Sequence, residues 1–169
     1  MATLETRLAR LEAKEAATAC LARYMDLCDV PGPLAHLDEI GTLFTEDAVW
    51  EGIGPEYADA FGRAEGRAAV QALVGDYLPP VEHFVRNAHL VGAGQVELVD
   101  RGRAVGQWLM QQLSLRTDGR AELLCARIRV AFVLTATKHQ APHARMQRFT
   151  TQRLFATAVS AEAMAHLIG

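Results

Sequence analysis

Two residues that together could move a proton stand more than fifty positions apart in this chain. Asp29 lies at the end of a first amphipathic helical pattern, and His83 lies in the strand-like run Val81-Glu82-His83-Phe84-Val85-Arg86-Asn87. An imidazole beside a carboxylate forms a general base together with the group that orients it, which is the commonest apparatus for proton transfer near neutral pH. Whether this chemistry is available depends on a fold that brings the two residues together.

The first half of the chain has the pattern of helices around a short strand. Apolar residues recur at three- and four-residue spacings up to Cys28, and Pro31-Gly32-Pro33 then stops the helix. The elements expected here, in order, are a helix over 3–28, a short helix over 34–44, a strand at 48–51, a loop with a short strand over 54–66 and a third helix over 67–77 closed by Pro79-Pro80.

The second half of the chain has the pattern of an antiparallel meander. Turn signals such as Thr117-Asp118-Gly119 separate alternating or β-branched runs. Helices followed by consecutive strands indicate an α+β fold with the helices covering one face of the sheet. The strands expected are 82–91, 95–100, 103–116, 121–137 and 144–157, and a short helix with Ser160 as its N-cap is expected at 160–168.

The overall composition bounds the class of protein. The 169 residues carry a net charge of −3 and no basic stripe, which argues against a nucleic-acid partner. Three cysteines without a CxxC pair favour a reducing cytoplasm over a disulfide framework. The longest apolar stretch, 130–136, is far too short to span a bilayer, and the charged N-terminus does not have the pattern of a signal peptide. We therefore expect a cytoplasmic protein with no membrane partner.

Four segments of the chain carry a family resemblance: Tyr24-Met25-Asp26-Leu27-Cys28-Asp29, Leu43-Phe44-Thr45-Glu46-Asp47-Ala48-Val49-Trp50, Gly66-Arg67-Ala68-Ala69-Val70 and His83-Phe84-Val85-Arg86-Asn87. Together they resemble the SnoaL-like branch of the nuclear-transport-factor-two superfamily over roughly residues 5–157. The resemblance implies a cystatin-like α+β fold, a cone-shaped half-barrel in which a curved, mixed, mostly antiparallel sheet wraps over three N-terminal helices and encloses an apolar pocket. Residues 1–169 are expected to form a single SnoaL-like domain.

Within that superfamily, the Tyr-x4-Asp element with a histidine at this strand position is similar to the scytalone dehydratase, bile-acid dehydratase and hexachlorocyclohexane dehydrochlorinase group. Those enzymes use an Asp–His pair to take a proton from carbon and expel a leaving group, without metal or organic cofactor. The resemblance implies His83 as the base, Asp29 as its orienter, Tyr24 as a hydrogen-bond donor to substrate and Arg148 as a pocket residue. Gln107 departs from the pattern, because some members have an acid or a histidine on the central strand and an amide cannot transfer a proton in the same way.

Each of these assignments has a structural alternative. His83, flanked by apolar residues, has the pattern of a buried core histidine, and Tyr24 lies on the apolar stripe of its helix. Asp29 could end the helix through a local turn, and Asp26 competes with it in the same helical turn. Arg148 faces either the pocket or solvent.

Alternation along the strands extends the candidate site. Period two puts Val85, Asn87 and His89 on the face of His83, and puts Thr150 on the face of Arg148. His139 and His143 suit a metal only on a helix, which Pro142 opposes, so no metal site is expected. The candidate wall residues are Trp50, Phe61, Leu73, Tyr77, Trp108, Met110 and Phe132, and the substrate-binding candidates are Arg148, Gln107, Trp50, Asn87, Trp108 and Thr150.

The sequence therefore predicts a cofactor-independent lyase, a dehydratase-type enzyme acting on a small hydrophobic cyclic substrate. An isomerase or polyketide cyclase would use the same proton transfer without elimination. Two non-catalytic alternatives are a small-ligand binding protein and the small subunit of an oxygenase, since this fold hosts all of these functions. A stand-alone enzyme or binder is expected to be a homodimer or a homotrimer.

Overall fold

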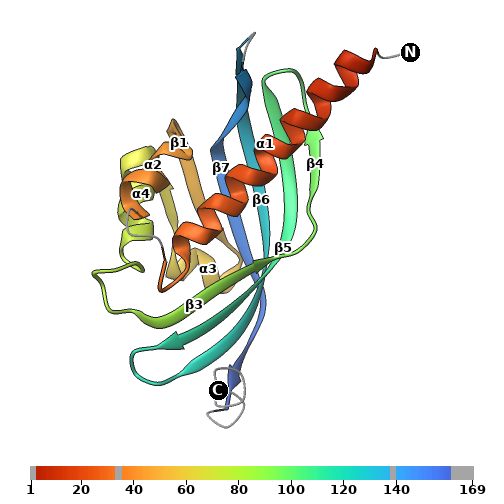
Figure 1. Ribbon diagram of the computed structural model, residues 1–169. Helices are drawn as coiled ribbons and strands as arrows, with labels where there is room; N and C mark the ends of the chain where they lie inside the picture. The colour runs from red at the N-terminus through yellow and green to blue at the C-terminus, as the bar shows by residue number, and fades with distance from the viewer. Residues whose placement is uncertain (1–2, 33–35, 138–139, 161–169) are drawn as a thin grey trace.

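The fold is an α+β arrangement of one curved sheet and the helices packed against it (Figure 1). The computed structural model describes residues 3–32, 36–137 and 140–160. Its elements are the helices α1 (Leu4–Cys28), α2 (His36–Thr42), α3 (Pro55–Ala60) and α4 (Arg67–Gly75) and the strands β1 (Phe44–Ile53), β2 (Arg63–Glu65), β3 (Phe84–Val91), β4 (Gln95–Leu98), β5 (Arg103–Arg116), β6 (Ala121–Thr137) and β7 (Gln140–Val159).

The sheet is mixed and does not close into a barrel. Its strand order is β2-β1-β7-β6-β5-β3, and β4 pairs with β5 beside β3. The β1–β7 pair is parallel, whereas the other ladders between described strands are antiparallel. The long strands curve visibly in Figure 1, and the β6–β7 ladder shifts register between Cys125 and Ala126 and between Ala131 and Phe132. Such irregularities bend a strand pair and increase its twist. The sequence prediction of a curved, mostly antiparallel sheet is therefore confirmed.

Helix α1 crosses the inner face of the long strands (Figure 1). The Thr3 hydroxyl caps its start by accepting a hydrogen bond from the backbone N–H of Thr6, at 3.2 Å. The apolar stripe that the sequence predicts is buried only from the third turn onward, because Leu4, Leu8 and Leu11 are exposed. The residues that pack on the sheet recur three or four positions apart and are Ala13, Ala17, Cys20, Leu21, Tyr24 and Cys28.

The segment between β1 and α4 differs from the prediction. The expected short strand is present as β2, but a helical turn, α3, precedes it. Pro55 stands at the first helical position, where its missing N–H costs no helical hydrogen bond. Four helices, not three, therefore lie among the described residues, and the second ends at Thr42, so Phe44 belongs to the sheet. Beyond Ser160, the expected helix at 160–168 lies outside the described residues.

Trp108 of β5 is one of the large buried residues of the core. Its indole is 3% exposed and meets the ring of Phe132 edge-on at 6.2 Å between centroids. A Cβ atom added to Gly106 would lie 2.1 Å from this indole, and one added to Gly94 would lie 1.7 Å away. The two glycines thus give the indole the room to lie flat along the sheet.

Gly106→Ala is expected to lower the free energy of unfolding by about 1–3 kcal/mol, because the new methyl group overpacks the Trp108 ring. Gly102→Ala is the matched control, since its added Cβ would meet its nearest atom at 3.7 Å, an ordinary contact. Urea unfolding followed by circular dichroism measures both, and equal stabilities of the two variants would contradict this packing.

Candidate active site

A cavity of about 390 Å³ lies between the helices and the inner face of the sheet. Most of the wall is apolar or aromatic, and polar side chains enter the cavity from α3, β3, β5, β6 and β7. A cavity with apolar walls and a few convergent polar groups is typical of small-molecule sites. The apolar and aromatic wall is formed by Tyr24, Met25, Trp50, Tyr57, Phe61, Leu73, Val74, Tyr77, Leu78, Met110, Leu124 and Phe149.

The end of α1 is tied to the middle of β3 by backbone hydrogen bonds. Val30 and Asn87 exchange both of their backbone N–H···O bonds, at 2.8 and 2.9 Å. The Asn87 amide adds a longer bond of 3.4 Å to the carbonyl oxygen of Cys28. This bridge decides which residue of β3 lies beside Asp29, because Asp29 directly precedes Val30.

The residue that Asp29 contacts is His89. The Oδ1 atom of Asp29 accepts a hydrogen bond from the backbone N–H of His89 at 2.9 Å and lies 2.8 Å from the ring Nδ1 of His89. An ionised carboxylate only accepts hydrogen bonds, so Nδ1 carries a proton and Nε2 keeps its lone pair in the neutral ring. The His89 side chain is 10% exposed and lines the cavity, and no partner for Nε2 occurs among the described residues. This arrangement is that of a general base held by its orienting carboxylate.

The expected contact between Asp29 and His83 is not found, and His89 takes the place of His83. The alternation that was expected to run from His83 to His89 is broken, because the β3–β5 ladder shifts register between Phe84 and Arg86. As a result Val85 is exposed, whereas Asn87 and His89 face the cavity. A register shift of this kind changes which face a side chain occupies.

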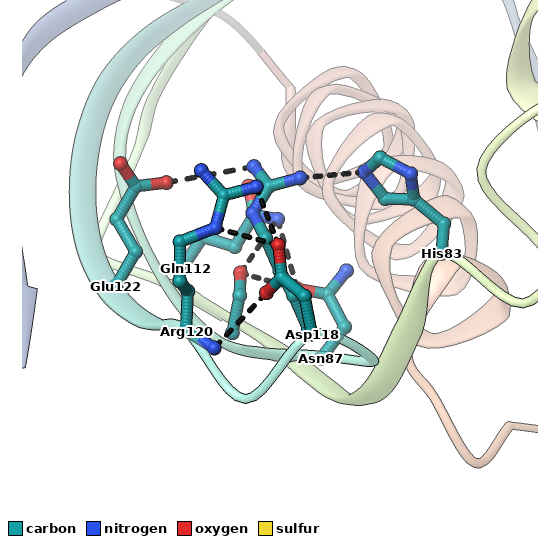
Figure 2. Close-up of polar contacts among 8 residues, drawn as sticks. His83, Asn87, Gln112, Asp118, Arg120 and Glu122 are labelled. Atoms are coloured by element: carbon teal, nitrogen blue, oxygen red, sulfur yellow. Dashed lines mark hydrogen bonds and ion pairs between the residues drawn. The ribbon is translucent and has the colours of Figure 1, made fainter. Parts of the chain in front are cut away.

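His83 also lines the cavity, but its ring is engaged by an arginine. Arg116 Nη1 lies 2.8 Å from His83 Nε2, and a guanidinium can only donate, so this nitrogen accepts and is not free to take a proton. Figure 2 shows His83 and Glu122 on opposite sides of this guanidinium, with Glu122 at 3.8 Å from Nη2. Burial of the ring lowers the pKa of His83 from 6.5, Arg116 lowers this pKa further, and Asp118 opposes the change.

A buried amide network lies beside His89. Gln112, its partner in the β3–β5 ladder, donates through Nε2 to Asn87 Oδ1 at 2.8 Å and to the Ser114 hydroxyl at 3.3 Å. Ser114 in turn donates to Asn87 Oδ1 at 3.0 Å, and the labelled amides can be followed in Figure 2. Since its NH₂ group is used in this way, Gln112 offers only its carbonyl oxygen to the cavity.

Three of the predicted substrate-binding residues lie on the outer face of the sheet, away from the cavity. Gln107 accepts a hydrogen bond from Arg129 at 2.9 Å, and Arg148 pairs with Glu51 at 3.1 Å. Thr150 lines the same shallow outer groove as Gln107 and Arg148. On β7 the inner face instead carries Phe149, Thr151 and Arg153, all of which line the cavity. The prediction for Arg148 was wrong because side chains alternate between the two faces of β7. The apolar Phe149 is buried on the inner face, so its neighbour Arg148 points outward.

The other predicted residues divide between the wall and the core. Trp50 lines the cavity and donates its indole N–H to the Tyr24 hydroxyl at 3.0 Å. Burial raises the pKa of Tyr24 well above 10, and the neighbouring Cys28 raises it further. Trp108 and Phe132 are buried in the core away from the cavity. Trp50 and Asn87 line the cavity, as do the wall candidates Phe61, Leu73, Tyr77 and Met110.

The choice between the two aspartates at the end of α1 is also resolved. Asp26 is ion-paired with Arg23 on the surface, so Asp29 is the one that faces β3. Within the described ranges no group of three or more histidine, cysteine, aspartate or glutamate side chains could hold a metal ion, and His139 lies outside those ranges. No described helix is long and apolar enough to cross a bilayer.

Comparison with known proteins places the chain in a family. The model of the SnoaL-like domain matches residues 9–141, so the chain belongs to the SnoaL-like domain family. No curated protein sequence matches it with statistical significance.

Several solved structures share the fold. A hexachlorocyclohexane dehydrochlorinase, LinA type 2, superposes with a TM-score of 0.73 at 14% identity, covering 92% of this chain and 94% of that one. A scytalone dehydratase-like protein from Novosphingobium aromaticivorans gives 0.71 at 16% identity, with coverages of 90% and 91%. An NTF2-like protein with a cystatin-like fold from Novosphingobium aromaticivorans gives 0.69 at 24% identity, with coverages of 100% and 99%. The predicted superfamily and fold are thus confirmed.

The pKa of His83 provides a test of the geometry of this site. Its imidazole is expected to titrate below its ordinary value of 6.5, and protonation of Nε2 on acidification removes the acceptor for Arg116. Arg116→Gln is expected to raise the pKa of His83, although burial keeps this pKa below 6.5. NMR titration of the histidine ring protons measures this change, with Arg86→Gln as the control that removes the same charge from an exposed position of β3. An unchanged titration in Arg116→Gln would contradict the contact.

Proposed function

We propose that this protein is a cofactor-independent lyase of the dehydratase type, in which His89 removes a proton from carbon and Asp29 orients its ring. The observation that carries the proposal is the 2.8 Å contact between Asp29 Oδ1 and His89 Nδ1, with the His89 ring on the cavity wall. A base held in this way contributes on the order of 10²–10⁴-fold to the rate of a proton transfer. The proposal keeps Asp29 from the sequence prediction and replaces His83 by His89.

The elimination needs no group beyond this pair and the substrate. His89 Nε2 accepts the proton, the electrons of the C–H bond form the new double bond, and the bond to the leaving group breaks with its electron pair. Asp29 stabilises the imidazolium that results. When the leaving group is a hydroxyl on the same face of the substrate, the imidazolium returns the proton to it, water departs and the pair is restored.

The cavity suits a small hydrophobic cyclic substrate. Rings line it on several sides, with Trp50 stacked on Phe149 at 5.3 Å between centroids and Phe61 edge-on to Trp50 at 5.4 Å. Such walls bury flat apolar molecules well. The fold neighbours named as a dehydrochlorinase and a dehydratase-like protein support elimination as the reaction class.

A second candidate is an isomerase or a cyclase, and Gln112 is the observation that favours it. Gln112 stands beside His89 in the ladder but directs its NH₂ group to Asn87 and Ser114, so it cannot assist a leaving group that lies out of reach of His89. A reaction in which His89 returns the proton to another carbon avoids that need. Either enzyme is expected to be a stand-alone cytoplasmic homodimer or homotrimer, whereas an oxygenase small subunit would need a larger catalytic partner.

Proton abstraction is testable before the substrate is known. Deuterium exchange beside the carbonyl of 2-tetralone in D₂O, followed by NMR, reports it directly, and cyclic β-hydroxy ketones and chlorinated cyclohexanes report elimination. Asp29→Asn and His89→Gln are each expected to lower the enzyme-dependent rate by about 10²–10⁴-fold. His83→Gln, which retains an acceptor for Arg116, is the matched control and is expected to keep the rate within about threefold.

Two outcomes would contradict the proposal. One is a rate in His89→Gln that equals that of the unmodified protein. The other is loss of the rate in His83→Gln with retention in His89→Gln, which would restore His83 as the base. Absence of any exchange or elimination across the panel would favour the binding-protein alternative.

A further inference from the structure

We propose that Arg116, positioned by His83, binds a carboxylate group of the substrate at the end of the cavity opposite to His89. The inference rests on the proposed function, because it concerns the molecule that occupies the same cavity. The apolar walls of the cavity indicate a small, apolar, cyclic substrate, and the inference adds a carboxylate group to that description.

The register of the sheet separates the cation from the base. Arg116 pairs with Phe84 in the β3–β5 ladder, and His89 pairs with Gln112. Four residues of β3 therefore lie between the two positions, and on β5 Arg116 is four positions from Gln112, which corresponds to about 13 Å of extended strand. Since the side chains of both His89 and Arg116 line the cavity, a bound molecule meets the base at one end and the cation at the other.

The guanidinium of Arg116 has unused hydrogen-bonding capacity. One of its five N–H groups donates to His83, and its plane lies over the Phe84 ring with 5.4 Å from Cζ to the centroid. Glu122 is 3.8 Å away, which is too long for a hydrogen bond. No other acceptor for Arg116 occurs among the described residues, so the guanidinium can still form the paired N–H···O bonds that carboxylates accept.

His83 fixes this cation without neutralising it. Because its Nε2 accepts from Nη1, the imidazole is neutral and holds the guanidinium against the cavity wall. The nearby Asp118 is engaged chiefly by Arg120, through bonds of 2.7 Å to Nε and 3.0 Å to the backbone N–H. These bonds lower the pKa of Asp118, and Arg116 lowers it to a smaller extent.

The other arginine of the cavity is a weaker candidate. Arg153 lies 3.5 Å from Glu56, closer than Arg116 lies to Glu122. No described side chain holds Arg153 by a hydrogen bond in the way that His83 holds Arg116. Arg116 is therefore the better-positioned carboxylate site, and Arg153 provides a direct comparison.

The test compares two probes of nearly equal shape, 2-naphthoate and 2-naphthamide, which differ in charge. Trp50 in the cavity wall reports binding through its fluorescence. The unmodified protein is expected to bind the naphthoate at least about tenfold more tightly than the amide, as a charge-assisted pair would provide. Arg116→Gln is expected to abolish this preference while changing the amide affinity by less than about twofold.

Control variants separate local binding from general charge. Arg86→Gln removes the same charge from an exposed position of β3, and Arg153→Gln removes the second cavity cation. Both are expected to keep the preference. Arg116→Lys retains a point charge without the fork and is expected to keep part of the preference, so it carries the test if Arg116→Gln fails to fold.

Equal affinity for the two probes in the unmodified protein, or a preference that survives in Arg116→Gln, would overturn the inference. Loss of the preference in Arg153→Gln instead of Arg116→Gln would also overturn it. Asp29→Asn and His89→Gln are expected to retain the preference, because they act at the other end of the cavity. Failure of the exchange assay with an intact Arg116 effect would therefore refute the catalytic proposal and leave the carboxylate site standing.

Discussion

The two backbone hydrogen bonds between Val30 and Asn87 are the constraint on which the site depends. They join the end of the first helix to a strand more than fifty residues away in sequence, and they place Asp29 against His89. A carboxylate on a helix end is otherwise free to turn toward solvent, as Asp26 does with Arg23. Because both partners are held by backbone as well as side-chain contacts, the geometry of the pair is pre-organised, which a proton-transfer site requires.

The strands β3 and β5 supply His89, the amides and Arg116 to the cavity, and Glu56, Glu122, Thr151 and Arg153 add polar groups from α3, β6 and β7. Asn87, Gln112 and Ser114 satisfy one another, so these buried polar side chains carry little desolvation penalty and leave one carbonyl oxygen directed inward. At the far end of β5, Arg116 is held by His83. Under the two proposals above, the base His89 and the cation Arg116 lie toward opposite ends of the cavity with rings between them. This arrangement orients a bound molecule as well as limiting its size.

Much of this architecture was predictable from the sequence, and the failures have specific causes. The strands at 103–116 and 121–137 agree with β5 and β6, because turn residues and alternation mark such boundaries locally. The histidine that contacts Asp29 is His89, six residues beyond the expected His83, since the register shift near Phe84 and the Val30–Asn87 bridge are tertiary features. Arg148 and Gln107 were placed on the wrong face. The two-residue alternation of a strand shows which residues share a face but not which face is buried. The adjacent apolar residues Phe149 and Trp108 are the ones that mark the inner face.

The most direct test of the central claim is the protonation of the two ring nitrogens of His89, measured by ¹⁵N NMR at about pH 8. The account predicts a proton on Nδ1, where Asp29 accepts it, and an unprotonated Nε2 facing the cavity. In Asp29→Asn this preference is expected to weaken, because the carboxylate that selects the tautomer is gone. A proton found on Nε2 in the unmodified protein would contradict the account, since the ring would then have no free nitrogen with which to accept a proton from carbon.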